Sequence, residues 1–249
     1  LFGEEGWQYP QKALLSVKGK YSVSELKKYA MEAIMEAEPA PGMALAEKQS
    51  ETEEALPDFM KDKEVDETHE VSNVGAFRGT AYHRALELID FAGRPDERDE
   101  AWLRSQLNAM TSAGRLSGEQ RQSIRIRDIA DMVFSNLGLR MAEADRRHEL
   151  YREAQFVMGV PVSALYPEVD SEETVLIQGI IDAYFEENGE LILLDYKTDH
   201  VSKQDGADIL KKRYKRQLDD YQQALEQMLQ KKVRQKLIYS FALKCWIEI

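Results

Sequence analysis

Two aspartates and a lysine occupy positions from which they could act together on a substrate. Apolar segments rich in Ile, Leu and Val flank Asn188-Gly189, a dipeptide typical of tight β-hairpin turns. A two-residue turn there places Asp182 opposite Asp195, with Cβ atoms about 4.5–5.5 Å apart, and puts Lys197 on the same face as Asp195. The sequence therefore predicts that two carboxylates and an ammonium group converge within a sheet.

Opposed carboxylates in an apolar setting repel each other unless a proton or a cation lies between them. We favour a divalent ion, Mg²⁺ or Mn²⁺, held by Asp182 and Asp195, because hard oxygen ligands suit phosphate chemistry. Lys197 beside the ion would orient a water molecule or stabilise negative charge in the transition state. Two alternatives remain. A glycosidase-like acid–base pair explains Lys197 less well, and a frayed hairpin end would point these groups into water.

The elements that must position these residues change in type along the chain. The first part is predicted to be mainly helical, with helices over 22–37, 79–91, 97–112, 118–137 and 139–149. Capping boxes begin the first and fourth of these helices, at Ser22 and at Ser117, and Gly138 is a plausible stop for the fourth. Strands follow over 153–164, 174–187, 190–198 and 233–247, with a long helix over 206–230. This order predicts an α/β fold with a mixed central sheet flanked by helices and a largely helical N-terminal part.

Acidic residues concentrate in one stretch of the chain. Residues 47–70 hold ten Asp and Glu against three Lys, which accounts for more than half of the net charge of −12. Such a segment is typical of an exposed linker. We therefore expect an N-terminal segment and helix over 1–37, an acidic linker or strap over 38–72, and the main domain over 73–249. The acidic total argues against a general polyanion binder, so any nucleic acid would have to contact local basic patches.

Several kinds of site are excluded by the composition. With Cys245 as the one cysteine, an internal disulfide, a cysteine-ligated zinc site and an iron–sulfur cluster are all excluded. No apolar run is long enough to span a membrane, and neither a signal peptide nor a phosphate-binding G-x-x-x-x-G-K-[ST] loop for ATP occurs. We expect a cytoplasmic protein. Because the chain begins without Met, we also expect it to be a fragment of a longer polypeptide.

Four motifs in order resemble those of the RecB-type branch of the PD-(D/E)XK nucleases. They are Gly79-Thr80-Ala81-Tyr82-His83-Arg84-Ala85-Leu86-Glu87, Gly179-Ile180-Ile181-Asp182, Asp195-Tyr196-Lys197-Thr198-Asp199 and Gln217-Leu218-Asp219-Asp220-Tyr221. The segment 21–27 is similar to the beginning of the C-terminal nuclease domain in AddA-type helicase–nuclease proteins. The resemblance implies that residues 73–249 form a RecB-like nuclease domain with the restriction-endonuclease-like core of that family.

Site roles carry over from this resemblance by position. The implied metal ligands are His83, Asp182, Asp195 and the backbone carbonyl of Tyr196, and the implied catalytic groups are Lys197, Asp182 and Asp195. Glu153 and Glu87 are implied to support the site, and Gln217 and Tyr221 to lie near DNA. A lone helical histidine is more often structural, so His83 is predicted to be a ligand only because the other motifs accompany it.

Two basic patches are candidates for DNA contact. The first lies at the start of the long helix and comprises Lys211, Lys212, Arg213, Lys215 and Arg216. The second comprises Arg115, Arg121, Arg125 and Arg127. Phosphates could follow the first patch toward the metal, although runs of charge are often only solvated helix faces.

The resemblance implies a Mg²⁺-dependent DNase, exonuclease or endonuclease, acting in double-strand-break processing and recombinational repair. Its substrate would be DNA, single-stranded as it leaves a helicase motor upstream in the same polypeptide. An AddB-type subunit would be the partner, and no membrane is involved. The alternative is a non-catalytic DNA-holding or partner-docking domain on the same fold, which would not need opposed carboxylates.

Overall fold

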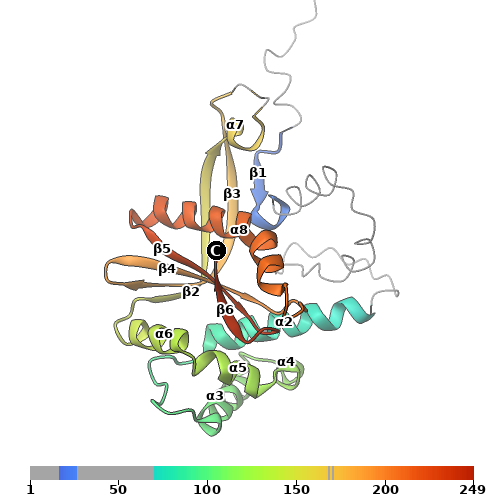
Figure 1. Cartoon of the computed structure of the whole chain (residues 1–249), viewed down its shortest axis with the longest axis vertical. Coiled ribbons are helices and arrows are strands. Elements are labelled where there is room, and N and C mark those ends of the chain that lie inside the picture. The colour runs from blue at the N-terminus through green and yellow to red at the C-terminus, as the bar shows by residue number, and fades with distance from the viewer. Residues whose placement is uncertain (1–16, 27–69, 168, 170) are drawn as a thin grey trace, which may run out of the picture.

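The computed structural model of the chain describes residues 17–26, 70–167, 169 and 171–249 (Figure 1). Ser22 and Glu25 form the predicted capping box, with the Glu25 amide donating to Ser22 Oγ and the Ser22 amide donating to Glu25 Oε2. The rest of the predicted N-terminal helix and nearly all of the acidic linker lie outside the described residues. The helix that carries His83 begins at Glu70, before the predicted domain boundary at 73.

A mixed six-stranded sheet forms the centre of the fold, in the order β1-β3-β4-β5-β6, with β2 paired to β3 (Figure 1). Its strands are β1 (Lys20–Ser22), β2 (Leu150–Pro161), β3 (Thr174–Glu187), β4 (Glu190–Lys197), β5 (Val233–Ser240) and β6 (Cys245–Glu248). The β1–β3 and β4–β5 pairs are parallel, and the other pairs are antiparallel. The predicted mixed sheet is confirmed.

The β3–β4 hairpin has the register that a two-residue turn dictates. Asn188 and Gly189 both have positive φ, 55° and 81°, as in a type I′ turn, whose twist matches that of the flanking strands. Pairing runs from Glu187 with Glu190 to Ala183 with Leu194. The next residues in this register are Asp182 and Asp195.

The sheet opens at Asp182. Beyond Ala183, β3 pairs with β2 and β1 and no longer with β4, while β4 stays paired with β5 as far as Lys197. The β2–β3 ladder is itself interrupted at this point, because it includes Arg152 with Ala183 and Ala154 with Ile181 but not the pair between them. The interruption leaves backbone and side-chain groups of the three strands available for a site.

Helices cover the two faces of the sheet separately. One core contains side chains of α2 (Glu70–Leu88), α3 (Glu100–Ser112), α5 (Ile126–Val133) and α6 (Asn136–Arg146), together with residues that flank the short helix α4 (Gly118–Ser123). The second core contains side chains of α7 (Val162–Leu165) and α8 (Gly206–Leu229). Alternate residues of β4 enter the two cores, as Leu194 and Leu193 illustrate.

Several predicted boundaries are wrong. The single helix expected over 118–137 is broken after Ser123, where Ile124 and Arg125 are extended and the Arg125 amide donates to the Tyr82 hydroxyl. Gly138 does not stop a helix but lies in the first turn of α6, capped by Ser135. The strand expected over 233–247 is two strands, β5 and β6, joined by a turn. Sequence reasoning missed β1 altogether.

No helix among the described residues is long and apolar enough to cross a membrane.

Candidate metal centre

Asp182 occupies the point where the sheet opens. Its Oδ2 atom accepts a hydrogen bond of 2.7 Å from the backbone amide of Tyr196 on β4. The carboxylate thus takes the place of a backbone carbonyl in holding β4. Its side chain is 12% exposed, so the charge lies in a largely desolvated position.

His83 reaches Asp182 from α2. The helix buries Tyr82, Ala85 and Leu86 completely in the core, which sets its rotation and aims His83 at the opening of the sheet. The His83 Nδ1 atom lies 3.2 Å from Asp182 Oδ1, and Nε2 lies 2.9 Å from the carbonyl oxygen of Tyr196. The imidazole is therefore flanked by two oxygen acceptors.

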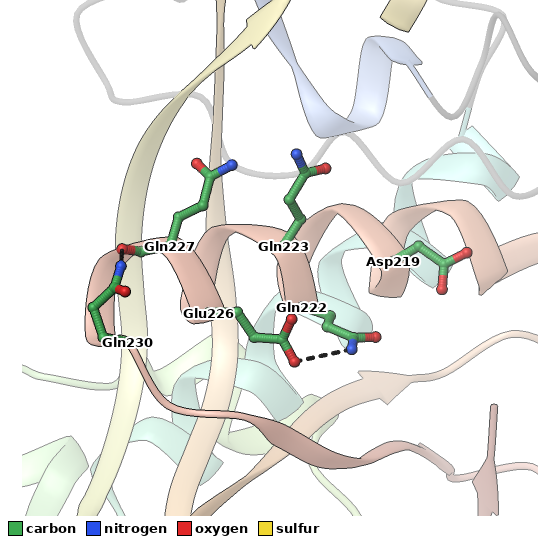
Figure 2. Close-up of a pocket in the computed structure, with 6 residues that line it drawn as sticks. All are labelled: Asp219, Gln222, Gln223, Glu226, Gln227 and Gln230. Atoms are coloured by element: carbon green, nitrogen blue, oxygen red, sulfur yellow. Dashed lines mark hydrogen bonds between the residues drawn. The ribbon is translucent and has the colours of Figure 1, made fainter.

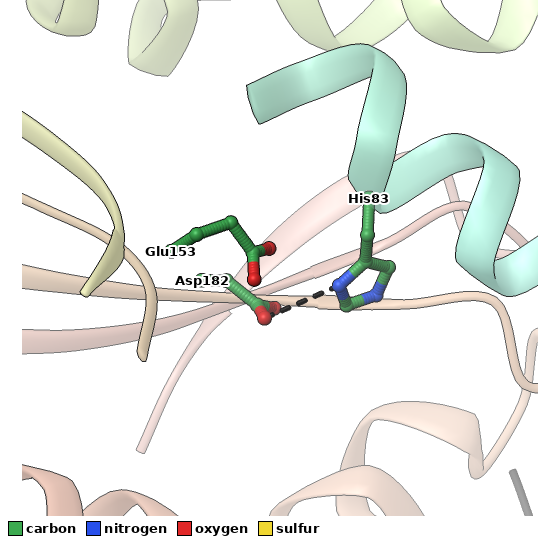
Figure 3. Close-up of side chains that lie close together, drawn as sticks. All are labelled: His83, Glu153 and Asp182. Carbon is green, nitrogen blue, oxygen red and sulfur yellow. Dashed lines mark ion pairs between the residues drawn. The ribbon is translucent and has the colours of Figure 1, made fainter. Parts of the chain in front are cut away.

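Glu153 on β2 completes a cluster with these two residues. One ligand atom each from His83, Glu153 and Asp182 lies within 4.8 Å of the others, and Figure 3 shows the carboxylates of Glu153 and Asp182 side by side near the imidazole ring. Glu153 has a φ of 49°, in the left-handed region that costs a non-glycine residue energy. This conformation coincides with the interruption of the β2–β3 ladder.

The three groups shift one another's proton affinities. Burial opposes charge on His83, but the carboxylate of Asp182 outweighs it and raises the pKa of His83 to about 9. Burial would raise the pKa of Asp182, yet the charge and hydrogen bond of His83 hold that pKa below its usual range. Burial and the negative charge of Asp182 raise the pKa of Glu153 to about 7. Near neutral pH, His83 is protonated and can donate to both flanking oxygens.

Asp195 and Lys197 form an ion pair beside this cluster. The Lys197 ammonium lies 2.9 Å from Asp195 Oδ2 and 3.1 Å from Oδ1, and the two side chains are 11% and 1% exposed, Lys197 first. Both residues therefore lie on one face of β4, as the alternation of the strand predicts. The cluster of potential ligands contains Glu153, which the sequence placed in a supporting role, and does not contain Asp195. The register opposite Asp182 was the signal that could have found Glu153.

Glu87 is less central than its spacing from His83 suggested. Its carboxylate receives a hydrogen bond of 2.5 Å from Arg84 on the same helix. Its charge contributes to the raised pKa of Glu153, after burial and Asp182. Glu87 therefore influences the cluster through its charge and belongs to an ion pair on α2.

Gln217 and Tyr221 do not lie on a surface that DNA can reach in this structure. Each is 1% exposed, and Gln217 Nε2 donates to the Tyr221 hydroxyl at 2.8 Å. The Tyr221 ring packs edge-on against Phe156 in the core under α8. The structure therefore contradicts direct contact between these side chains and DNA, because helical spacing turns both residues toward the sheet.

The basic patch on α8 is partly neutralised by neighbouring acids. Arg213 pairs with Asp199 at 2.7 Å, Lys215 pairs with Asp219 at 2.7 Å, and Arg216 pairs with Asp220 at 3.0 Å. Lys211 and Lys212 are exposed, and neither forms an ion pair within the described part of the chain. Only part of the predicted patch therefore offers uncompensated positive charge.

An open hollow on α8 lies apart from this chemistry (Figure 2). Its lining consists of Asp219, Gln222, Gln223, Glu226, Gln227 and Gln230. Several of these groups bond to one another, as Gln222 does to Glu226 and Gln230 does to the Gln227 carbonyl (Figure 2). The residues that line the hollow supply neither an imidazole nor an ammonium group, and we do not assign it a catalytic role.

The donor set at the opening of the sheet fits a divalent cation. An imidazole nitrogen, two carboxylates and a backbone carbonyl converge there, and oxygen donors suit Mg²⁺ while the imidazole favours Mn²⁺. The charge on protonated His83 already bridges the carboxylate and the carbonyl. A cation at the same place would satisfy the same oxygens.

Comparison with known proteins assigns the class. The family model of the PD-(D/E)XK nuclease superfamily matches residues 46–245, so the chain belongs to this superfamily of nucleases. The mixed sheet flanked by helices is the restriction-endonuclease-like core expected for that class.

The most similar curated relatives share one description, that of the A-type subunit of an ATP-dependent helicase/nuclease. The protein from Bacillus pumilus is 35% identical over 242 residues, covering 94% of this chain and 18% of the relative. The protein from Lachnoclostridium phytofermentans is 33% identical and covers 79% of this chain and 16% of the relative. The protein from Clostridium beijerinckii is 31% identical, with 98% and 18% covered. The chain thus spans less than a fifth of the length of these relatives and matches their AddA-type nuclease portion.

Proposed function

We propose that this chain is a divalent-metal-dependent deoxyribonuclease that hydrolyses phosphodiester bonds, with single-stranded DNA as its substrate. The observation that carries the proposal is the meeting of His83, Glu153 and Asp182 beside the Asp195–Lys197 pair, where the sheet opens. Opposed, buried carboxylates destabilise a fold, so their presence together favours a site that binds a cation over a surface that only holds DNA.

In this proposal His83, Asp182, Asp195 and the Tyr196 carbonyl hold the ion, with Glu153 as a further carboxylate beside them. A bound Mg²⁺ or Mn²⁺ neutralises charge on the scissile phosphate and lowers the pKa of a coordinated water. Lys197 supplies positive charge for the transition state, since its ammonium is fixed at the edge of the same cluster. Asp182 fixes the Tyr196 backbone, and so also the direction of its carbonyl.

The printed names of the relatives extend the proposal to a larger enzyme. They describe one subunit of an ATP-dependent helicase/nuclease, and the chain aligns with less than a fifth of each relative. We propose that a helicase motor upstream in the same polypeptide delivers a strand to this site during double-strand-break processing. An AddB-type second subunit would complete the assembly, which would act in the bacterial cytoplasm at the nucleoid.

The test combines cleavage with metal binding. Wild-type protein should cleave single-stranded DNA with Mg²⁺ or Mn²⁺, and Asp182→Asn should lose both cleavage and Mn²⁺ affinity measured by calorimetry. Lys197→Ala should keep Mn²⁺ affinity and lose about 10²- to 10³-fold in kcat, because its charge acts on the transition state. Asp96→Asn, which removes an exposed carboxylate far along the chain from the motifs, is the matched control and should cleave normally.

The non-catalytic alternative predicts a different pattern. A DNA-holding domain would bind DNA without cleaving it and would retain that binding after Asp182→Asn. Full cleavage activity in Lys197→Ala, or Mn²⁺ affinity unchanged by Asp182→Asn, would contradict the proposed site.

A further inference from the structure

Two different groups contact the ammonium of Lys197. One is the carboxylate of Asp195 on the same strand, and the other is the face of the Tyr214 ring, whose centroid lies 4.3 Å from Lys197 Nζ. Tyr214 belongs to α8, so the ammonium lies between the sheet and the helix that covers it. A cation at this distance over an aromatic face is attracted by the electrons of the ring.

The Tyr214 ring is itself held in place. Its hydroxyl donates to both oxygens of Asp199, at 2.8 and 2.9 Å, and Arg213 bonds the same carboxylate at 2.7 Å. Asp199 follows Lys197 by two residues, just beyond the end of β4. Tyr214 is 3% exposed, and burial raises the pKa of its hydroxyl, so the phenol remains a neutral donor. Neither the ring nor its partner can turn away without breaking these bonds.

We propose that Tyr214 is a positioning residue for Lys197, with Asp199 and Arg213 holding its ring. The inference rests on the proposed catalytic role of Lys197. The ring attracts the ammonium without competing for it as a second carboxylate would, because an aromatic face neither binds a hard cation nor takes a proton. Asp195 is proposed to share its charge with a metal ion, and Tyr214 then keeps Lys197 in place independently of that ion.

This assignment changes the interpretation of Arg213. The sequence pattern placed Arg213 in a run of cations facing DNA, yet its guanidinium is bound to Asp199, which is 10% exposed. In the proposed arrangement Arg213 acts on the side of α8 that faces the sheet. The neighbouring cations Lys211 and Lys212 remain directed to solvent.

The first experiment measures geometry and needs no catalysis. The ε-methylene protons of Lys197 lie near the ring, so their NMR resonance should be shifted upfield in the wild-type protein. Lys197→Arg assigns that resonance by removing it. Tyr214→Phe should keep the shift, and Tyr214→Leu should abolish it. A resonance at the ordinary lysine position in folded wild-type protein would overturn the proposal.

The second experiment measures turnover. Tyr214→Leu should lower kcat on single-stranded DNA by about tenfold, as expected from the loss of a desolvated cation–π contact, with KM and Mn²⁺ affinity unchanged. Tyr214→Phe keeps the ring face and should restore most of the activity. Phenylalanine analogues with increasing fluorination at position 214 should lower kcat stepwise, because fluorine withdraws electron density from the ring face. A kcat indifferent to fluorination would overturn the proposal.

Controls separate this inference from loss of folding and from failure of the proposed function. Leu225→Ala removes a buried side chain elsewhere on α8, so it should lower the melting temperature without changing kcat. If Lys197→Ala retained cleavage, the proposed function would fail. If Lys197→Ala lost cleavage while Tyr214→Leu kept the wild-type kcat, only the positioning role of Tyr214 would fail.

Discussion

His83 lies between two oxygen acceptors, the carboxylate of Asp182 and the carbonyl of Tyr196. A neutral imidazole can donate to only one of them, whereas an imidazolium donates to both. This geometry and the charge of Asp182 explain why the pKa of His83 rises to about 9 despite burial. A proton and a divalent cation would therefore compete for the same oxygens, and metal binding must depend on pH.

We expect Mn²⁺ affinity to rise with pH. His83 has a pKa of about 9 and must lose a proton to bind a metal ion, so the logarithm of affinity should rise by about one per pH unit between pH 7 and 9. Glu153 has a pKa of about 7, so below pH 7 its proton must also leave, and the slope should approach about two. Calorimetry in buffers of different ionisation enthalpy measures the protons released.

Glu153→Gln provides the control for this pH dependence. The substitution removes the group that titrates near pH 7, so the slope below pH 7 should fall to about one, while the slope between pH 7 and 9 stays the same. Mn²⁺ affinity that does not change between pH 6 and 9 would rule out His83 as a ligand.

The Asp195–Lys197 pair makes a second prediction at the residue scale. Asp195 is 1% exposed, and its removal leaves a buried ammonium without its carboxylate. Asp195→Asn should therefore lower the free energy of unfolding by about 3 kcal/mol, while Asp195→Asn combined with Lys197→Met should recover much of the loss. Chemical denaturation of the single and double variants measures the coupling. A single variant as stable as wild type would show that Lys197 finds another partner.

At the scale of elements, local rules predicted the hairpin and several helix starts. Asn188-Gly189 determined both the turn and the register, and Ser117 with Gln120 forms the predicted capping box of α4. These features depend on residues close in sequence. The sequence therefore sufficed to bring Asp182 and Asp195 onto neighbouring strands and Lys197 next to Asp195.

Features that depend on distant contacts could not be predicted. The break between α4 and α5 is held by the Tyr82 hydroxyl, more than 40 residues away in the chain. The left-handed backbone of Glu153 depends on the place where three strands part. Tyr214 was predicted only as part of an apolar helix face, and its contact with Lys197 requires α8 to pack on β4. In each case tertiary packing decides the conformation.

Gly138 provides a prediction for the packing of α5 against α6. A Cβ atom at position 138 would lie 2.1 Å from the Val133 carbonyl oxygen, which belongs to the backbone at the end of α5. Gly138→Ala should therefore destabilise the protein by about 1–3 kcal/mol, because the two helices must separate to admit the methyl group. Thermal unfolding measures the effect.

Gly118→Ala is the matched control. Gly118 begins α4, and a Cβ atom there meets no other atom within 4 Å. Alanine in a helix should be neutral or stabilise the protein by up to about 1 kcal/mol relative to glycine. Equal effects of the two substitutions would contradict the close approach of α5 and α6.

At the scale of the whole molecule, charge must guide an anionic strand across a protein with a net charge of −12. The beginning of α8 lies next to the site, since Tyr214 contacts Lys197 and Arg213 binds Asp199. Within the described residues, Lys211 and Lys212 extend from this turn without ion-pair partners, whereas Lys215 and Arg216 are paired with Asp219 and Asp220. We therefore expect the two pairs of cations to contribute unequally to DNA binding.

Replacement of Lys211 and Lys212 by Gln should weaken binding of single-stranded DNA and flatten its salt dependence. Each lost phosphate contact lowers the slope of log affinity against log salt concentration by about 0.7, so the double variant should lose about 1.4. The variant with Lys215 and Arg216 replaced by Gln should lose less, because intramolecular acids already neutralise those charges. Titration of labelled DNA at several salt concentrations, with Ca²⁺ in place of Mg²⁺ to suppress cleavage, compares the two. If neither slope changes, α8 is only a solvated face, and the strand must follow another path. The exposed Arg115, Arg125 and Arg127 would then be replaced in the same assay.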